Sequence, residues 1–214
     1  TSTTAWGEYQ RGLPLLTLVR LARWGDVLEE TAGADAAERT PGMFEYARGI
    51  ALVRTGRVAE TEVMVVSLDE RARTARTAAK PDDDLAKMMA ERLATLSSQL
   101  KAEVAFARGD VDAALAAGRE AIRAEEAMGG EPPLLAGGSQ VALGDLLLRA
   151  RRYPEAEAAF RADLALQPGS GWALRGLQLA VAAQNRGAEA QQVRAEWARA
   201  WLEADAGLRL APPS

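Results

Sequence analysis

The feature that most constrains the fold of this 214-residue chain is a short turn signal that recurs along it. Each copy contains a charged residue and lies between two stretches with helical patterning. The copies are Ala22-Arg23-Trp24, Thr55-Gly56-Arg57-Val58, Arg108-Gly109-Asp110-Val111, Ala150-Arg151-Arg152-Tyr153 and Asn185-Arg186-Gly187. Counted on the last residue of each copy, the spacings are 34, 53, 42 and 34 residues. Helical stretches separated in this way predict about five antiparallel hairpins, close to ten helices, and essentially no β-strand.

One hairpin carries a specific motif. The pattern W-x2-L-G-x2-Y…A-x3-F…P aligns with Gln140, Leu143, Gly144, Leu147, Ala156, Phe160 and Pro168. Five of the seven positions match, and the Trp and Tyr positions depart. The chain therefore resembles tetratricopeptide-repeat proteins. The resemblance implies an all-α, right-handed α-solenoid of about five hairpins, forming a single repeat domain over residues 1–214, with Phe160 among the most buried side chains.

The other hairpins match the motif less closely. The second keeps Gly49 and the turn residue Gly56 but has Arg48 where leucine is usual. The runs over 44–51 and 198–205 resemble the C-terminal part of larger bacterial tetratricopeptide-repeat proteins, which implies that Thr1 lies within a longer array.

Two spacings exceed 34 residues, so two hairpins are expected to have lengthened helices or loops. Residues 60–79 and 83–107 both read as long helices on either side of Lys80-Pro81. The acidic run 82–84 fits the capped start of the second helix better than a metal site. The glycines and prolines of residues 129–138 predict a loop, where a hinge could lie.

Composition excludes many kinds of active site. The chain contains no histidine and no cysteine, which removes zinc sites, disulfides, cysteine nucleophiles and histidine-dependent triads. No nucleotide-binding, hydrolase or calcium motif occurs. We therefore predict no catalytic residue, no metal and no cofactor.

The charge and hydropathy of the chain bear on its partners. A net charge of −4 argues against non-specific nucleic-acid binding, and no apolar run approaches the roughly 18 residues of a membrane span. The expectation is a soluble protein; a cytoplasmic location is favoured, although no feature fixes the compartment.

The resemblance implies a binding groove lined by the first helix of each hairpin. Aligning the hairpins on Leu15, Gly49, Ala102, Gly144 and Gln178 places recurring polar residues on that face. The candidate groove residues are Arg20, Tyr46, Arg54, Gln99, Glu103, Asp145, Arg149 and Arg175. A row of guanidinium groups suits an acidic peptide, because each can bind a carboxylate through two hydrogen bonds. The arginines also have a structural interpretation, since a cation is favoured in the last turn of a helix.

Three functions follow for consideration. The first is a non-enzymatic scaffold that binds a protein or peptide, with Arg54 and Arg149 as exposed contacts whose loss leaves stability nearly unchanged. The second is a structural or oligomerisation module of a longer chain, in which Trp197 and Trp201 on the final helix join a second copy instead of packing in the core. The third and weakest is an enzyme with a carboxylate or arginine site.

Overall fold

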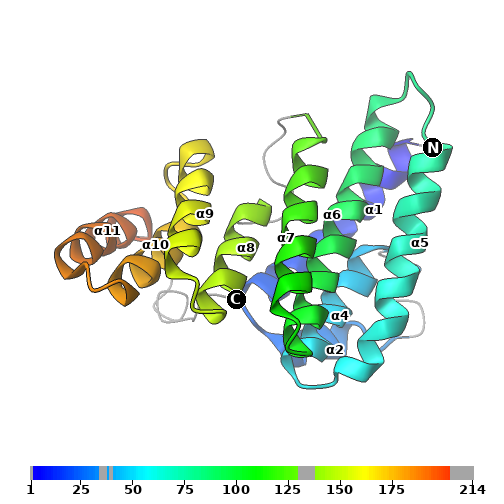
Figure 1. Cartoon of the computed structure of the whole chain (residues 1–214). Helices are drawn as coiled ribbons and strands as arrows, with labels where there is room; N and C mark the ends of the chain where they lie inside the picture. The colour runs from blue at the N-terminus through cyan, green and yellow to red at the C-terminus, as the bar shows by residue number, and fades with distance from the viewer. Residues whose placement is uncertain (1, 34–37, 39–40, 130–137, 203–214) are drawn as a thin grey trace. The chain divides into compact units, whose positions relative to one another are not determined.

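The computed structural model describes residues 2–33, 38, 41–129 and 138–202. These residues form ten α-helices and one 3-10 helix without any β-strand, as the sequence predicts (Figure 1). The chain divides into two compact units, unit 1 over residues 1–136 and unit 2 over residues 137–214. The boundary falls in the predicted loop over 129–138, of which residues 130–137 lie outside the described part.

Helices that are neighbours in sequence pack against each other within each unit. Unit 1 contains α1 (Ser2–Arg20), α2 (Trp24–Glu30), α4 (Met43–Arg54), the 3-10 helix η1 (Val58–Thr61), α5 (Glu62–Ala78), α6 (Asp84–Ala107) and α7 (Val111–Glu126). Unit 2 contains α8 (Gly138–Arg149), α9 (Tyr153–Leu166), α10 (Gly171–Ala183) and α11 (Gly187–Ala200). The long helices predicted on both sides of Pro81 are α5 and α6. None of the described helices combines the length and apolarity that a membrane crossing requires.

All five predicted turns are confirmed, because helical structure begins at Trp24, Val58, Val111, Tyr153 and Gly187. The turns share one backbone conformation. Two residues before each helix start, φ is positive: 52°, 80°, 83°, 58° and 63° at Ala22, Gly56, Gly109, Arg151 and Asn185. The N–H of the following residue then bonds to the carbonyl five residues earlier, at 2.8 to 3.3 Å. This bond closes a Schellman motif, which satisfies a carbonyl at the end of the preceding helix.

The residue that precedes each second helix is charged and has a partner three residues on. In four turns it is an arginine paired with an acid in the first turn of the helix: Arg23–Asp26, Arg57–Glu60, Arg152–Glu155 and Arg186–Glu189. In the third turn Asp110 instead accepts a hydrogen bond from the Ala113 N–H at 3.0 Å. Both arrangements put negative charge at a helix N-terminus, where the helix dipole stabilises it.

Buried Glu45 organises the middle of unit 1. One of its carboxylate oxygens accepts the Gly42 N–H at 2.7 Å, which caps α4. The other accepts Ser67 Oγ at 3.0 Å and Arg71 Nε at 2.6 Å, both from α5. Arg48, which replaces the usual leucine, donates to the carbonyl and hydroxyl oxygens of Thr31 at the end of α2. These polar side chains tie α4 to its two neighbours.

The core of unit 2 is built around Phe160, which is fully buried, as predicted. Its ring lies so close to Gly144 of α8 and Gly176 of α10 that a Cβ atom at either glycine would come within 2.6 Å or 2.2 Å of a ring carbon. The two glycines therefore allow three helices to pack around one aromatic ring.

Replacing Phe160 with Ala should destabilise unit 2 by about 3–5 kcal/mol, because a cavity remains that α8 and α10 cannot both close. Urea unfolding followed by tryptophan fluorescence would measure the loss, since Trp172, Trp197 and Trp201 lie in unit 2. The control is Leu166→Ala, whose side chain is 75% exposed, with an expected change within about 0.5 kcal/mol. Equal effects of the two variants would contradict the assignment of Phe160 as the packing centre.

Candidate binding surfaces

Four of the eight predicted groove residues meet between α4 and α6 in unit 1. The Tyr46 hydroxyl donates to Gln99 Oε1 at 2.9 Å, and both side chains are buried. Arg54 Nη2 donates to Glu103 Oε1 at 3.0 Å, and these side chains are 22% and 12% exposed. Two residues of α4 and two of α6 from the predicted set thus lie on facing helix surfaces, where they pair with one another.

The pairing changes the electrostatics expected for this face. Burial, together with the charge of Glu103, raises the pKa of Tyr46, so the phenol stays protonated and keeps its hydrogen bond. The Arg54 guanidinium also lies 5.9 Å from the centre of the Trp24 ring. The expectation that Arg54 is exposed is therefore wrong. We expect its removal to lower stability, because Glu103 would lose this partner at a mostly buried site.

The remaining predicted residues lie on α1, α8 and α10. Arg20 ends α1 and is partly buried, and this burial lowers its pKa. Buried Asp145 and partly exposed Arg149 lie four residues apart on α8 in unit 2. Arg175 on α10 donates to Gln178, and its guanidinium lies 5.4 Å from the centre of the Trp197 ring. The predicted set is thus divided between the two units.

Unit 1 also has a groove that the sequence did not predict. It lies among α5, α6 and α7 and encloses about 610 Å³. Small side chains line it between charged walls: Ala72, Ala94, Ser97 and Ser98. The sequence feature that corresponds to this groove is the run of small residues on one side of α6. Such a run equally indicates close helix packing, so it did not identify the groove.

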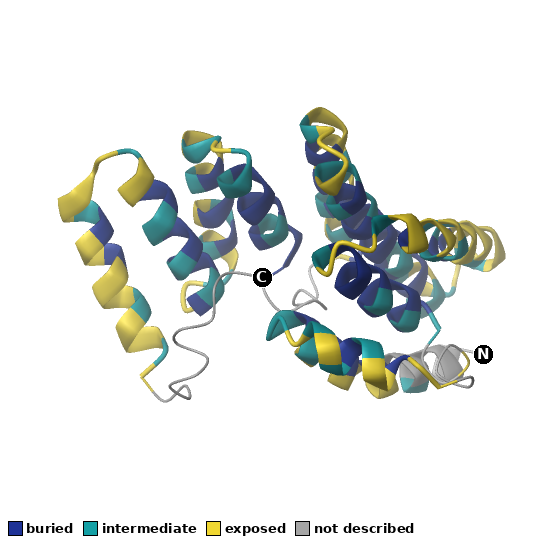
Figure 2. Ribbon diagram, turned by 90° about the horizontal axis from the view of Figure 1, so that it is seen from below, coloured by how far each residue is buried: buried dark blue, intermediate teal, exposed yellow. Residues whose placement is uncertain are grey.

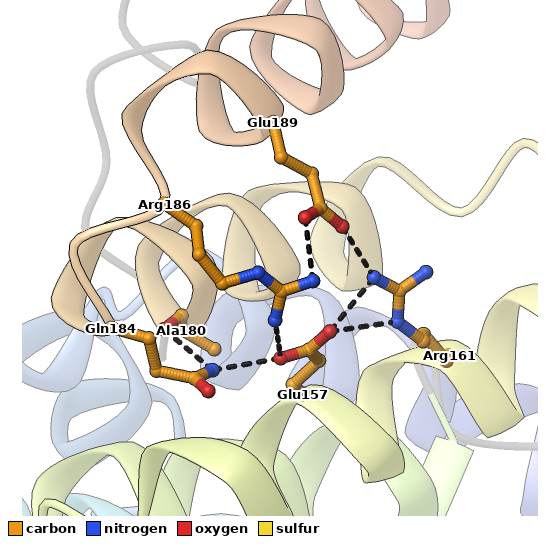
Figure 3. Close-up of polar contacts among 6 residues, drawn as sticks. All are labelled: Glu157, Arg161, Ala180, Gln184, Arg186 and Glu189. Atoms are coloured by element: carbon orange, nitrogen blue, oxygen red, sulfur yellow. Dashed lines mark hydrogen bonds and ion pairs between the residues drawn. The ribbon is translucent and has the colours of Figure 1, made fainter.

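A network of four charged side chains joins α9 to α11 in unit 2 (Figure 3). Glu157 accepts hydrogen bonds from Arg161 at 2.8 Å and from Arg186 at 2.6 Å. Glu189 accepts from the same two arginines, at 2.7 Å and 2.5 Å. Gln184, just after α10, adds a bond to Glu157 at 2.7 Å. Burial alone would raise the pKa of Glu157, but the bonds from Arg161, Gln184 and Arg186 outweigh it and lower the pKa.

The tryptophans of unit 2 pack against one another. The Trp172 and Trp201 rings meet edge to face with centroids 4.8 Å apart, and Trp197 lies 6.1 Å from Trp201. The outward positions of α11 are mainly polar or alanine, and Figure 2 shows them as exposed. Trp197 and Trp201 are half-buried and lie outside the fully buried core, so this packing supports their core interpretation only in part.

The acidic run at 82–84 serves the start of α6. Asp83 Oδ1 accepts the Ala86 N–H at 2.9 Å, and Asp84 pairs with Lys87 at 2.9 Å. Across the described residues, no group of three or more acidic side chains is placed to hold a metal ion. Comparison of the chain with models of protein families, with curated proteins and with solved structures finds no match.

Replacing Glu157 with Gln should destabilise unit 2 by about 1–3 kcal/mol at pH 7, because charge-assisted bonds from two arginines are lost. The pKa of Glu157 is lowered from its ordinary 4.5, so the stabilisation is present above about pH 4.5 and is lost as the pH falls through the folded-state value. Urea unfolding by tryptophan fluorescence at pH 7 and roughly pH 3 would check both effects.

Comparing the pH dependence of the unfolding free energy of the wild type with that of the variant isolates the contribution of Glu157, because both proteins contain Asp163. Burial raises the pKa of Asp163 and gives it the opposite pH dependence. The control is Glu155→Gln, which removes an exposed pair within one turn and should change stability by less than about 1 kcal/mol. A Glu157→Gln effect as small as that of the control would refute the role of the network.

Proposed function

We propose that this protein is a non-enzymatic scaffold that binds a protein or peptide, built as a right-handed array of tetratricopeptide-like hairpins. Support for the array comes from the five turns of one backbone conformation and from the packing of Phe160 between glycines of neighbouring hairpins. Within each unit, such an array presents the first helices of its hairpins on one face.

The observation that carries the binding proposal is the Arg54–Glu103 pair between α4 and α6. It is a charged pair at a partly exposed position of the face formed by the first helices. The hydrogen bond to Glu103 uses one of the five N–H donors of the guanidinium. A carboxylate of a partner would find an oriented arginine there, held by Glu103 and by the Trp24 ring.

This pairing also refines the expected partner. Because Glu103 offsets the charge of Arg54, the face recognises a carboxylate by geometry more than by long-range attraction. Arg149 and Arg175 supply cationic groups on the corresponding helices of unit 2. We therefore propose an acidic peptide as the ligand class, with moderate salt dependence of binding.

Removing both members of the pair tests this proposal without leaving either Arg54 or Glu103 behind alone. The double variant Arg54→Ala/Glu103→Ala should weaken binding of acidic peptides by about 1–3 kcal/mol, or roughly five- to 150-fold in Kd. A fluorescence-polarisation screen of synthetic peptides with graded Asp and Glu content, repeated over a range of NaCl concentrations, would measure it.

The matched control is Arg152→Ala/Glu155→Ala, which removes another Arg–Glu pair with the same net charge change at an exposed turn. It should bind the peptides like the wild type. If no peptide binds the wild type, or if both double variants lose affinity equally, the assignment of the first-helix face is wrong.

A second candidate, self-association, is favoured by two exposed leucines in unit 2. Leu166 is 75% and Leu202 is 69% exposed. Leu166 is the last residue of α9, and Leu202 follows Trp201 directly after the end of α11. Exposed apolar side chains next to aromatic rings are typical of contact surfaces.

Sedimentation velocity over a range of protein concentrations tests self-association. We expect a monomer–dimer equilibrium that the double variant Leu166→Ser/Leu202→Ser shifts at least tenfold towards monomer, which is about 1.4 kcal/mol. Val63→Ser, at a 68% exposed position of unit 1, should leave it unchanged. A wild-type protein that stays monomeric throughout would remove this candidate.

A further inference from the structure

Helix α5 is attached to unit 1 differently from helix α7, although both pack on α6. Of its 17 residues, α5 buries Leu68 and Ala72, with Met64 and Val65 partly buried. The 16 residues of α7 include five buried small or apolar side chains: Ala114, Leu115, Gly118, Ala121 and Ala124. Figure 2 shows α5 largely in the colour of exposed residues. Apolar burial therefore holds α5 less firmly than α7.

Ion pairs add to the limited apolar attachment of α5. Four of them reach from α5 to α4, α6 and the residue that follows α6: Arg71–Glu45, Asp69–Lys101, Arg76–Glu91 and Glu62–Arg108. Glu45 is 4% exposed, whereas the other seven side chains are 21–62% exposed. Three of the four pairs therefore lie where water and dissolved ions reach them.

Such pairs respond strongly to the solvent. Each exposed ion pair contributes only a small stabilisation, and salt lowers this contribution further because dissolved ions reach both charges. Apolar contacts such as those of α7 are not weakened by salt in this way. Ionic strength should therefore act selectively on α5.

The position of α5 also sets the shape of the groove on α6. Asp69, Arg73 and Arg76 of α5 form one wall, and Glu120 of α7 lies on the other. Asp69 also accepts a hydrogen bond from Ser97 Oγ, so the attachment of α5 covers part of the groove floor. Movement of α5 away from α6 would uncover Ala94 and Ser97.

We propose that α5 is a salt-sensitive latch, which undocks from α6 before the rest of unit 1 opens and so widens the groove between α5 and α7. This inference involves none of the predicted groove residues, although the Arg71–Glu45 pair also attaches α5 to α4. It gives unit 1 two states that differ in the surface of α6 that is accessible.

Hydrogen exchange of the intact wild-type chain tests the latch. Raising NaCl from about 0.05 M to about 1 M, which shortens the screening length to about 3 Å, should speed exchange of the α5 amides at least tenfold. Exchange of the α7 amides should change less than twofold. Equal responses of α5 and α7, or no response of α5, would overturn the proposal.

A charge variant separates the ion pairs from general salt effects. Asp69→Asn/Glu91→Gln removes the acids that pair with Lys101 and Arg76, so α5 should exchange at low salt nearly as fast as the wild type does at high salt. The control, Glu70→Gln/Glu155→Gln, makes the same net charge change but affects only pairs between residues three positions apart in the chain. A control that loosens α5 as much as the test variant would refute the latch.

A distance measurement distinguishes undocking from local fraying. Because the chain has no cysteine, Thr77→Cys and Arg123→Cys place spin labels on α5 and α7 alone. High salt should add a population with a longer distance between the labels. A distance distribution that is unchanged between the two salt concentrations would show that α5 stays docked.

Discussion

The architecture depends on one backbone event that occurs five times. A helix ends, a residue takes a left-handed conformation, the next N–H bonds back across the turn, and a second helix starts. A left-handed conformation costs a non-glycine residue roughly 1–2 kcal/mol, yet Ala22, Arg151 and Asn185 adopt it. The free energy gained when the two helices that flank each turn pack together must outweigh this cost. The hairpin is therefore fixed jointly by the turn and by the contacts that it creates.

The side chains around these turns show why the signal was readable from sequence. A charged residue follows the left-handed residue, and in four turns an acid stands three positions later. Both features involve residues that are close together in the chain, so they can be recognised from the sequence alone. Phe160 was predictable for a similar reason, because Gly144 belongs to the same motif. Its second neighbour, Gly176, comes from the next hairpin and was not identified.

Contacts between distant segments were only partly predictable. The alignment of hairpins brought Tyr46 and Arg54 to the same face as Gln99 and Glu103, but spacing alone does not reveal that these residues pair with one another. Whether these residues pair depends on the distance and the rotation between α4 and α6. The added length of α5 and α6 changes both of these quantities. The groove on α6 and the division into two units follow from the same tertiary geometry.

Arginine illustrates why counting charged residues does not locate a binding surface in this protein. Arg57 stabilises a turn through an acid three residues away, and Arg76 secures a helix through Glu91, fifteen residues away. Arg54 pairs with Glu103 across 49 residues and lies over the Trp24 ring. The sequence separation from the partner acid therefore distinguishes local caps from links between helices. Only the arginines that link two helices have a position set by the fold as a whole. Such side chains have the fixed orientation that recognition of a carboxylate through two hydrogen bonds requires.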